Sequence, residues 1–119
     1  MLVRPVPWRE LDASLAAQES SRRVQARVRA ARERQRVRLA PLGRRTNAEI
    51  PLGALESLVD ATPEAKALLA RAVDGLPLSA RAAHRALRVA RTVADLHGEP
   101  RVDDAAMAEA VALRAAGPA

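Results

Sequence analysis

The chain has 119 residues and a mass of 12.8 kDa, which suffices for one domain and excludes two independent domains of ordinary size. It has no cysteine and one aromatic residue, Trp8. Disulfide scaffolds, thiolate metal sites, cysteine nucleophiles and aromatic platforms for unpaired bases are therefore excluded. Because the sequence shows neither a secretory signal nor an apolar run of about 20 residues, we expect a cytoplasmic protein with no membrane partner.

Positive charge is concentrated in the first part of the chain. Residues 1–45 hold twelve basic and four acidic side chains, net +8, whereas residues 46–119 hold eight basic and ten acidic side chains, net −2. The sum is the net charge of +6, and almost all of it comes from arginine because Lys66 is the only lysine. Such an excess of arginine indicates either an anionic partner or a bias of composition.

The first residues are expected to lack a long helix. Two prolines favour extended backbone over residues 1–9, with Trp8 anchoring this part against the body of the protein. The pattern allows a short helical turn over Glu10–Ala17. We therefore expect a leading segment at 1–19 and a helical domain at 20–117.

A long basic helix is predicted next. Ser20 or Ser21 can cap it, and no glycine or proline interrupts the pattern before Pro41. Its apolar stripe is thin, and eight arginines cover the remaining surface: Arg22, Arg23, Arg27, Arg29, Arg32, Arg34, Arg36 and Arg38. Two interpretations stay open. The arginines bind nucleic-acid phosphates, or they form a solvated or subunit-facing surface in which Glu33 pairs with Arg29 or Arg36.

Two shorter helices are predicted in the middle of the chain. Thr46 or Asn47 is expected to cap a brief turn, and the leucine spacing then predicts an amphipathic helix over 52–59. A further helix is predicted to begin after the N-cap Thr62, because proline and glutamate follow it, and to end near Gly75.

The next predicted helix carries the sharpest local feature of the sequence. Ser79 is expected to cap a helix that runs to His97 and stops at Gly98. Its polar edge is expected to comprise Arg81, His84, Arg85, Arg88, Arg91 and Asp95. Arg81 lies in the first turn, where free backbone N–H groups and the positive end of the helix dipole attract anions. The residue is thus either a phosphate ligand or an ordinary arginine that is exposed or paired with an acid.

The remaining pattern completes an all-α prediction, a small bundle of about four to five helices. Asp103 is expected to cap a last helix, and no segment alternates long enough to indicate a strand. The glycines are isolated, so no phosphate-binding loop is present, and His84 and His97 are too far apart for a helical metal site. We read Asp103 and Asp104 as structural residues and expect no metal ligand in the chain.

Several separated motifs resemble the C-terminal domain of magnesium chelatase-like AAA+ ATPases, the ComM-type competence proteins. The strongest is LSARAAHRALRVARTVADL at residues 78–96. VPW at 6–8, VRAARERQ at 28–35 and TNAEIP at 46–51 resemble other family segments in the same order. The resemblance spans nearly the whole chain and implies a helical lid-type domain that follows an ATPase core upstream of Met1.

The resemblance also implies roles for residues and partners. Arg81 falls at the sensor 2 arginine, which contacts the γ-phosphate of ATP in its own or a neighbouring subunit. ATP and Mg²⁺ would be held through the core of the same polypeptide, in a homo-hexameric motor that promotes DNA branch migration during competence. The isolated chain would bind neither and would not be an enzyme, since the core supplies the catalytic groups.

A binding module is the alternative to this ATPase lid. In that hypothesis the chain is a stand-alone basic helical domain that binds DNA through phosphate contacts, for which the candidate residues are Arg22, Arg23, Arg27, Arg29 and Arg34. A third hypothesis, a pure oligomerisation element, predicts that the isolated chain associates with itself.

Overall fold

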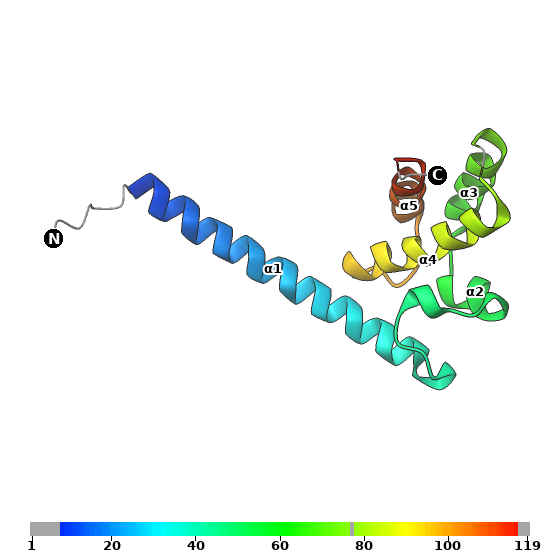
Figure 1. Cartoon of the computed structure of the whole chain (residues 1–119), viewed down its shortest axis with the longest axis horizontal. Helices are drawn as coiled ribbons and strands as arrows, with labels where there is room; N and C mark the ends of the chain where they lie inside the picture. The colour runs from blue at the N-terminus through cyan, green and yellow to red at the C-terminus, as the bar shows by residue number, and fades with distance from the viewer. Residues whose placement is uncertain (1–7, 77, 117–119) are drawn as a thin grey trace.

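The computed structural model describes residues 8–76 and 78–116, and these form an all-α bundle, as predicted (Figure 1). The helices are α1 (Trp8–Leu39), α2 (Leu52–Val59), α3 (Pro63–Gly75), α4 (Ala80–Leu96) and α5 (Asp104–Ala116), with short 3-10 turns η1 (Ala40–Leu42) and η2 (Asn47–Glu49). No strand occurs in these ranges, and the β-type pairing within them is one isolated bridge between Ala61 and Val102. None of the described helices combines the length and apolar character needed to cross a membrane.

The start of α1 differs from the prediction. The helix begins at Trp8, so the expected extended backbone at Trp8 and Arg9 and the expected cap at Ser20 or Ser21 are wrong. Both serines lie inside one continuous helix, because no glycine or proline occurs between Trp8 and Pro41 and the intervening residues are mostly good helix formers. Residues 1–7 and the side chain of Trp8, with its predicted anchoring role, lie outside the described residues. The division of the chain at residue 19 stays a prediction.

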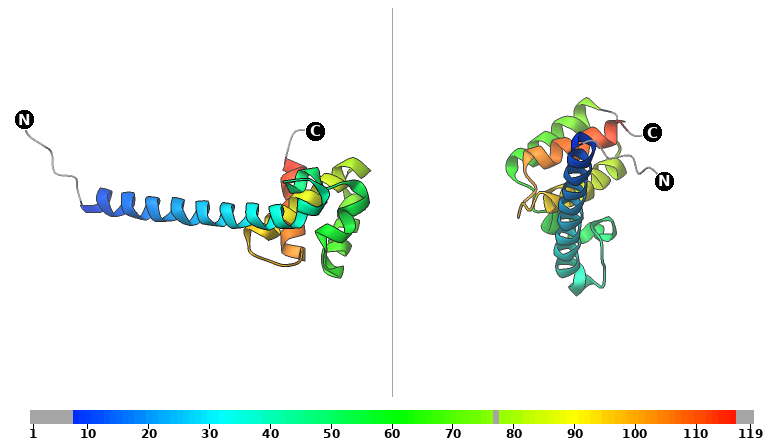
Figure 2. Two further views of the ribbon diagram at one scale, coloured as in Figure 1. Left: turned by 90° about the horizontal axis from the view of Figure 1, so that it is seen from below. Right: turned by 90° about the vertical axis from the view of Figure 1, so that its left-hand side faces the viewer.

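The first part of α1 projects from the rest of the protein (Figures 1 and 2). The 32 residues of the helix span about 48 Å at 1.5 Å per residue. The whole molecule extends over 66 × 36 × 24 Å with a radius of gyration of 19.0 Å, well above the value of about 14 Å expected for a compact chain of this length. From residue 13 onward, where the structure describes the side chains of α1, the buried ones lie in its C-terminal part: Ala31, Gln35 and Leu39.

The shorter helices begin at the predicted caps. The side-chain oxygen of Thr62 accepts a hydrogen bond from the Ala65 N–H at 3.1 Å, and Asp103 accepts one from the Ala106 N–H at 2.8 Å. The Glu49 carboxylate accepts hydrogen bonds from the Thr46 N–H and hydroxyl, which fixes the η2 turn. Local signals in the sequence were therefore sufficient to position these elements.

Helix α4 is the centre of the bundle. It packs against α1, α2, η2 and α5, while α3 packs against α5. The core contains residues of every α-helix, of the α2–α3 and α4–α5 loops and of the segment after η2: Leu39, Ile50, Leu55, Val59, Ala61, Ala65, Ala90, Val93, Ala94, Val102, Ala106, Met107, Ala110 and Val111. A main-chain link closes it, because Thr62 donates to the Val102 carbonyl at 2.9 Å and Val102 donates to the Asp60 carbonyl at 3.3 Å. This link ties the α2–α3 loop to the α4–α5 loop.

Replacing Leu39 tests how much the buried end of α1 contributes to the stability of the fold. Its side chain is 0 % exposed in the core, so Leu39→Ala is expected to lower the free energy of unfolding by about 2–5 kcal/mol. The matched control on the same helix is Leu15→Ala, because Leu15 is 52 % exposed and should change stability by about 0.5 kcal/mol or less. Urea unfolding followed by circular dichroism measures both, and equal effects would contradict this packing.

Candidate functional site

Arg81 lies at the N-terminus of α4, as the sequence predicted. Ser79 caps this helix through its side-chain oxygen, which accepts from the Ala82 N–H at 3.1 Å, while its carbonyl accepts from the Ala83 N–H at 2.9 Å. Arg81 is exposed one residue into the helix, and its side chain makes no hydrogen bond or ion pair with the part of the chain that the structure describes. The guanidinium group is therefore available beside the positive end of a helix dipole.

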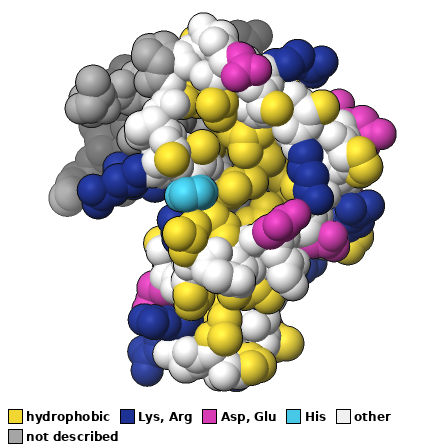
Figure 3. Space-filling view, turned by 90° about the vertical axis from the view of Figure 1, so that its right-hand side faces the viewer, with side chains coloured by type: hydrophobic (Ala, Val, Ile, Leu, Met, Phe, Trp, Pro, Cys, Tyr) yellow, Lys and Arg dark blue, Asp and Glu magenta, His cyan; other side chains and the backbone are white. Residues whose placement is uncertain are grey.

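An apolar groove opens on the surface of α2, α3 and α4 (Figure 3). Its volume is about 530 Å³, and its floor is formed by leucine and valine side chains, among them Leu55, Val59 and Leu69. Glu56, Lys66, Asp74 and His84 stand among its lining residues, and the space-filling view shows acidic and basic side chains around the hollowed apolar surface. His84 lies one turn after Arg81 on α4, so the groove lies close to the N-terminus of that helix.

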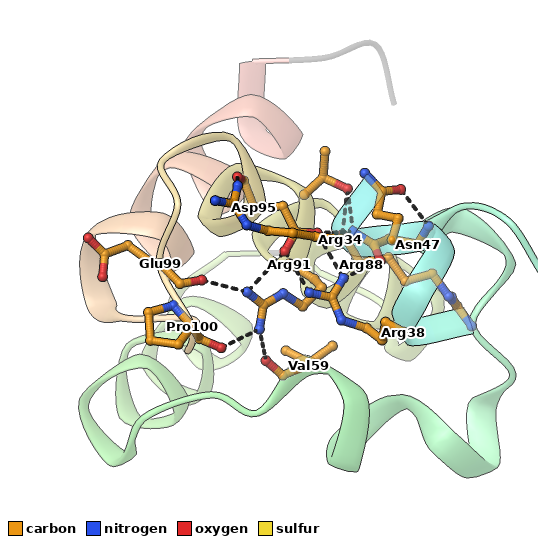
Figure 4. Close-up of polar contacts among 11 residues, drawn as sticks. Arg34, Arg38, Asn47, Val59, Arg88, Arg91, Asp95, Glu99 and Pro100 are labelled. Carbon is orange, nitrogen blue, oxygen red and sulfur yellow. Dashed lines mark hydrogen bonds and ion pairs between the residues drawn. The ribbon is translucent and has the colours of Figure 1, made fainter. Parts of the chain in front are cut away.

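The C-terminal end of α4 carries a buried charge network (Figure 4). Asp95 is 0 % exposed, and its two carboxylate oxygens accept hydrogen bonds from Arg38 of α1 at 2.6 and 2.8 Å. Asn47 donates to the same carboxylate at 2.9 Å, and Arg91 lies 3.2 Å from it. The Asn47 N–H in turn donates to Gln35 of α1 at 3.0 Å. One carboxylate thus joins α1, η2 and α4.

Arg91 anchors two loops from inside the protein. Its guanidinium group is 2 % exposed and donates to the main-chain carbonyls of Val59, Glu99 and Pro100 at 2.9 to 3.1 Å (Figure 4). Arg88, one turn earlier, donates two hydrogen bonds to the Ile50 carbonyl. These arginines thus give hydrogen-bond partners to main-chain carbonyls in or next to three loops, among them the carbonyls of the buried residues Ile50 and Val59.

Burial and charge act in opposite directions on these groups. Burial alone raises the pKa of Asp95, but the hydrogen bonds from Arg38 and Asn47 and the positive charges of Arg91 and Arg38 outweigh it, so the pKa lies below its usual value. Burial lowers the pKa of Arg91, and the Asp95 carboxylate partly opposes this change. Both side chains stay charged at neutral pH.

Two residues of the predicted polar edge of α4, Arg91 and Asp95, are buried instead of lying apart from the core. Helical periodicity places both beside the apolar face, and η2 and the end of α1 cover that flank of the helix. The sequence did indicate that the two residues pair, since an arginine and an aspartate four residues apart lie on the same face of a helix. Periodicity alone does not reveal that a third element covers the pair.

The candidate arginines of α1 fall into different environments. Arg34 donates to the Asp95 carbonyl at 2.7 Å, and Arg27 donates to the Leu96 carbonyl at 3.4 Å, so both bind the C-terminal end of α4. Arg22, Arg23 and Arg29 are exposed and make no such contact within the described residues. The structure therefore does not bring the five candidates together on one surface. It also separates Arg27 and Arg34 from Arg81, because the Asp95 and Leu96 carbonyls that they bind lie at the other end of α4, and the helix rises about 21 Å over the fourteen steps from Arg81 to Asp95.

The predicted pairing of Glu33 is confirmed for one of its two alternatives. Arg36 binds Glu33 through two hydrogen bonds of 2.6 and 2.9 Å, one turn apart on the exposed surface of α1. This contact lowers the pKa of Glu33 and raises that of Arg36.

Comparison with known proteins identifies the family of this domain. The model of the C-terminal domain of magnesium chelatase subunit ChlI matches residues 18–114, which is most of the chain. The chain therefore belongs to the magnesium chelatase C-terminal family. In this member the domain is an all-α bundle in which Arg81 lies at the capped N-terminus of α4.

A curated relative agrees with this assignment. The chain is 49 % identical over 47 residues to the competence protein ComM of Haemophilus influenzae. That match covers 40 % of this chain and 9 % of the relative, so the domain corresponds to a small part of a much longer protein. No solved structure matches the chain.

The Asp95 network can be tested by removing one charge. Asp95→Asn leaves two arginines facing a neutral amide, and it is expected to lower the free energy of unfolding by about 3–5 kcal/mol at pH 7. Glu33→Gln removes the carboxylate of an exposed pair and serves as the control, with no measurable change in the urea midpoint.

The same variant predicts a pH dependence. Because the folded-state pKa of Asp95 is lowered, its stabilisation is fully present above the unfolded pKa of about 3.9 and is lost as the pH falls through the folded value. The difference in stability between the wild type and Asp95→Asn should therefore shrink in acid. A difference that stays constant from pH 7 to pH 2 would contradict the lowered pKa.

Proposed function

We propose that this chain is the lid domain of an AAA+ ATPase and that Arg81 contacts the γ-phosphate of ATP as the sensor 2 residue. The observation that carries the proposal is the exposed guanidinium group of Arg81 in the first turn of the capped helix α4. The resemblance of the surrounding sequence to the sensor 2 motif, within a chain of this family, supports the same role. The parent protein would be a cytoplasmic ATPase.

The residues of this chain suit one part of a nucleotide site. Arg81 combines a fixed positive charge with the first N–H groups of α4, and both favour a terminal phosphate. The described residues hold no group of three or more histidine and acidic side chains that could bind a metal, so Mg²⁺ and the phosphate chain would be held by the core of the same polypeptide. Bound ATP supplies the reactive γ-phosphoryl group, and Arg81 binds and orients it.

The arrangement of α4 explains how a phosphate contact would reach the rest of the domain. Arg81 lies at one end of a helix of 17 residues, and the other end is bound to α1 through Asp95 and the Asp95 and Leu96 carbonyls. A shift of the Arg81 end would therefore move α1 together with the bundle. In the proposed homo-hexamer, this movement would couple ATP hydrolysis to neighbouring subunits and to action on DNA during competence.

One observation favours the alternative, a DNA-binding module. The N-terminal part of helix α1 projects from the bundle (Figure 2), and Arg22, Arg23 and Arg29 are exposed on α1. The family match favours the lid over a stand-alone module, and the two readings are compatible if α1 binds DNA within the motor.

The sensor 2 role predicts the behaviour of an Arg81 variant. In a protein that contains the core and this domain, Arg81→Ala is expected to slow ATP hydrolysis on the order of 10- to 1,000-fold, because the charge acts on the phosphate in the transition state. Phosphate release and the affinity for a fluorescent ATP analogue would be measured together. Arg85→Ala, an exposed arginine one turn further along α4, is the matched control and should keep normal hydrolysis.

The isolated chain gives a second readout. It should not hydrolyse ATP, because the core supplies the catalytic groups. An Arg81→Ala enzyme that bound and hydrolysed ATP like the wild type would refute the sensor assignment, whatever the effect of Arg85→Ala.

A further inference from the structure

The arginines of α1 fall on two faces of the helix. At about 100° per residue, Arg27, Arg34 and Arg38 share one face, and all three bind α4. A second group recurs seven, three and four residues apart and shares another face: Arg22, Arg29, Arg32 and Arg36. Gln25 has the same register, and we call these five residues the arginine stripe. The first face is committed to holding the fold, and the arginine stripe is not.

The arginine stripe is turned away from the bundle. Its residues are exposed, and Arg36 is the member that binds a neighbouring acid, Glu33. Within the described residues, Arg22, Arg29 and Arg32 make no side-chain hydrogen bond or ion pair. Seen from below, the N-terminal part of α1 extends away from the other helices, so the bundle leaves this part of the helix open to a large partner (Figure 2, left).

The composition of the arginine stripe selects a phosphate polymer as its partner. Guanidinium groups bind phosphate oxygens through two parallel hydrogen bonds, and the three unpaired arginines span about 15 Å at 1.5 Å per residue. A membrane surface would require an apolar face, whereas the exposed large apolar side chains between residues 13 and 30 are Leu15 and Val24. The chain also has no aromatic side chain near the stripe on which an unpaired base would stack.

We propose that Arg22, Arg29 and Arg32 bind the phosphate backbone of duplex DNA without reading its sequence. Duplex DNA carries one negative charge per about 1.7 Å of its axis and needs no base stacking, and a helix of 10–12 Å diameter fits beside or within its major groove of about 12 Å. Glu19 and the Arg36–Glu33 pair limit the site at its two ends. This site deepens the proposed action on DNA and rests on it, but it does not involve Arg81.

The proposal revises the candidate set taken from the sequence. Arg27 and Arg34 are removed because they bind carbonyl groups of α4, and Arg32 is added. Arg23 lies about 100° from Arg22 around the helix, outside the arginine stripe.

The test is the affinity of the 119-residue chain for a fluorescein-labelled duplex of mixed sequence, measured by anisotropy from 30 to 200 mM salt. Replacing Arg22, Arg29 and Arg32 together by glutamine is expected to weaken binding at low salt at least about tenfold. It should also reduce the slope of log affinity against log salt by about 2.7, at about 0.9 per lost phosphate contact. Glutamine is a good helix former, and circular dichroism should show unchanged helicity.

The matched control replaces Arg44, Arg71 and Arg85 by glutamine, which removes the same charge from exposed positions outside α1. This variant should keep most of the wild-type affinity. Equal loss in both triple variants would show attraction by net charge alone and overturn the site, as would a wild-type chain that does not bind at 30 mM salt. Tighter binding to a single strand of the same length would overturn the duplex assignment.

The assay contains neither ATP nor the core. Failure of the arginine stripe therefore leaves the sensor role of Arg81 standing, and failure of the Arg81 test leaves the measured DNA affinity standing.

Discussion

The fold of this domain depends on one buried carboxylate. Asp95 is fully enclosed, and it is stable there because Arg38, Asn47 and Arg91 surround it with donors and positive charge. An isolated charge in such a place would be strongly unfavourable, so each partner is needed once the carboxylate is buried. Because the partners come from α1, η2 and α4, the electrostatic requirement fixes the relative placement of three elements that the apolar core alone would constrain less closely.

This constraint explains why α1 can be so long and yet well placed. Its N-terminal part has little apolar surface and relies on helix propensity, while its last turns are held by Leu39, Arg38 and Arg34. The anchored turns set the direction of the whole helix, so its N-terminal part projects away from the bundle. The arginines of that N-terminal part then lie on surfaces defined by the docking of the other end.

The sequence predicted local structure better than it predicted contacts between elements. Thr62, Ser79 and Asp103 were recognisable as caps because each signal lies within three residues of its effect. The helix start at Trp8 was missed because prolines and serines suggested a boundary that good helix formers overrode. Arg81 was placed correctly by its cap, whereas the proposal that it acts as the sensor 2 residue rests on resemblance.

The arginines that bind groups inside the fold could not be distinguished from the free ones by composition, and the structure now separates them by the contacts that each one makes. Arg91 reaches three carbonyl groups at once, Arg38 binds both oxygens of one carboxylate, and Arg88 donates twice to one carbonyl. A lysine has one compact ammonium group and cannot reproduce these paired contacts. At these positions arginine is therefore required by the fold, and bias of composition is an insufficient explanation. Arg22, Arg29 and Arg32 make no such contacts within the described residues. Their presence therefore reflects either a partner outside the domain or the arginine-rich composition of the chain. Glutamine variants compared with a control of equal charge change distinguish these two explanations.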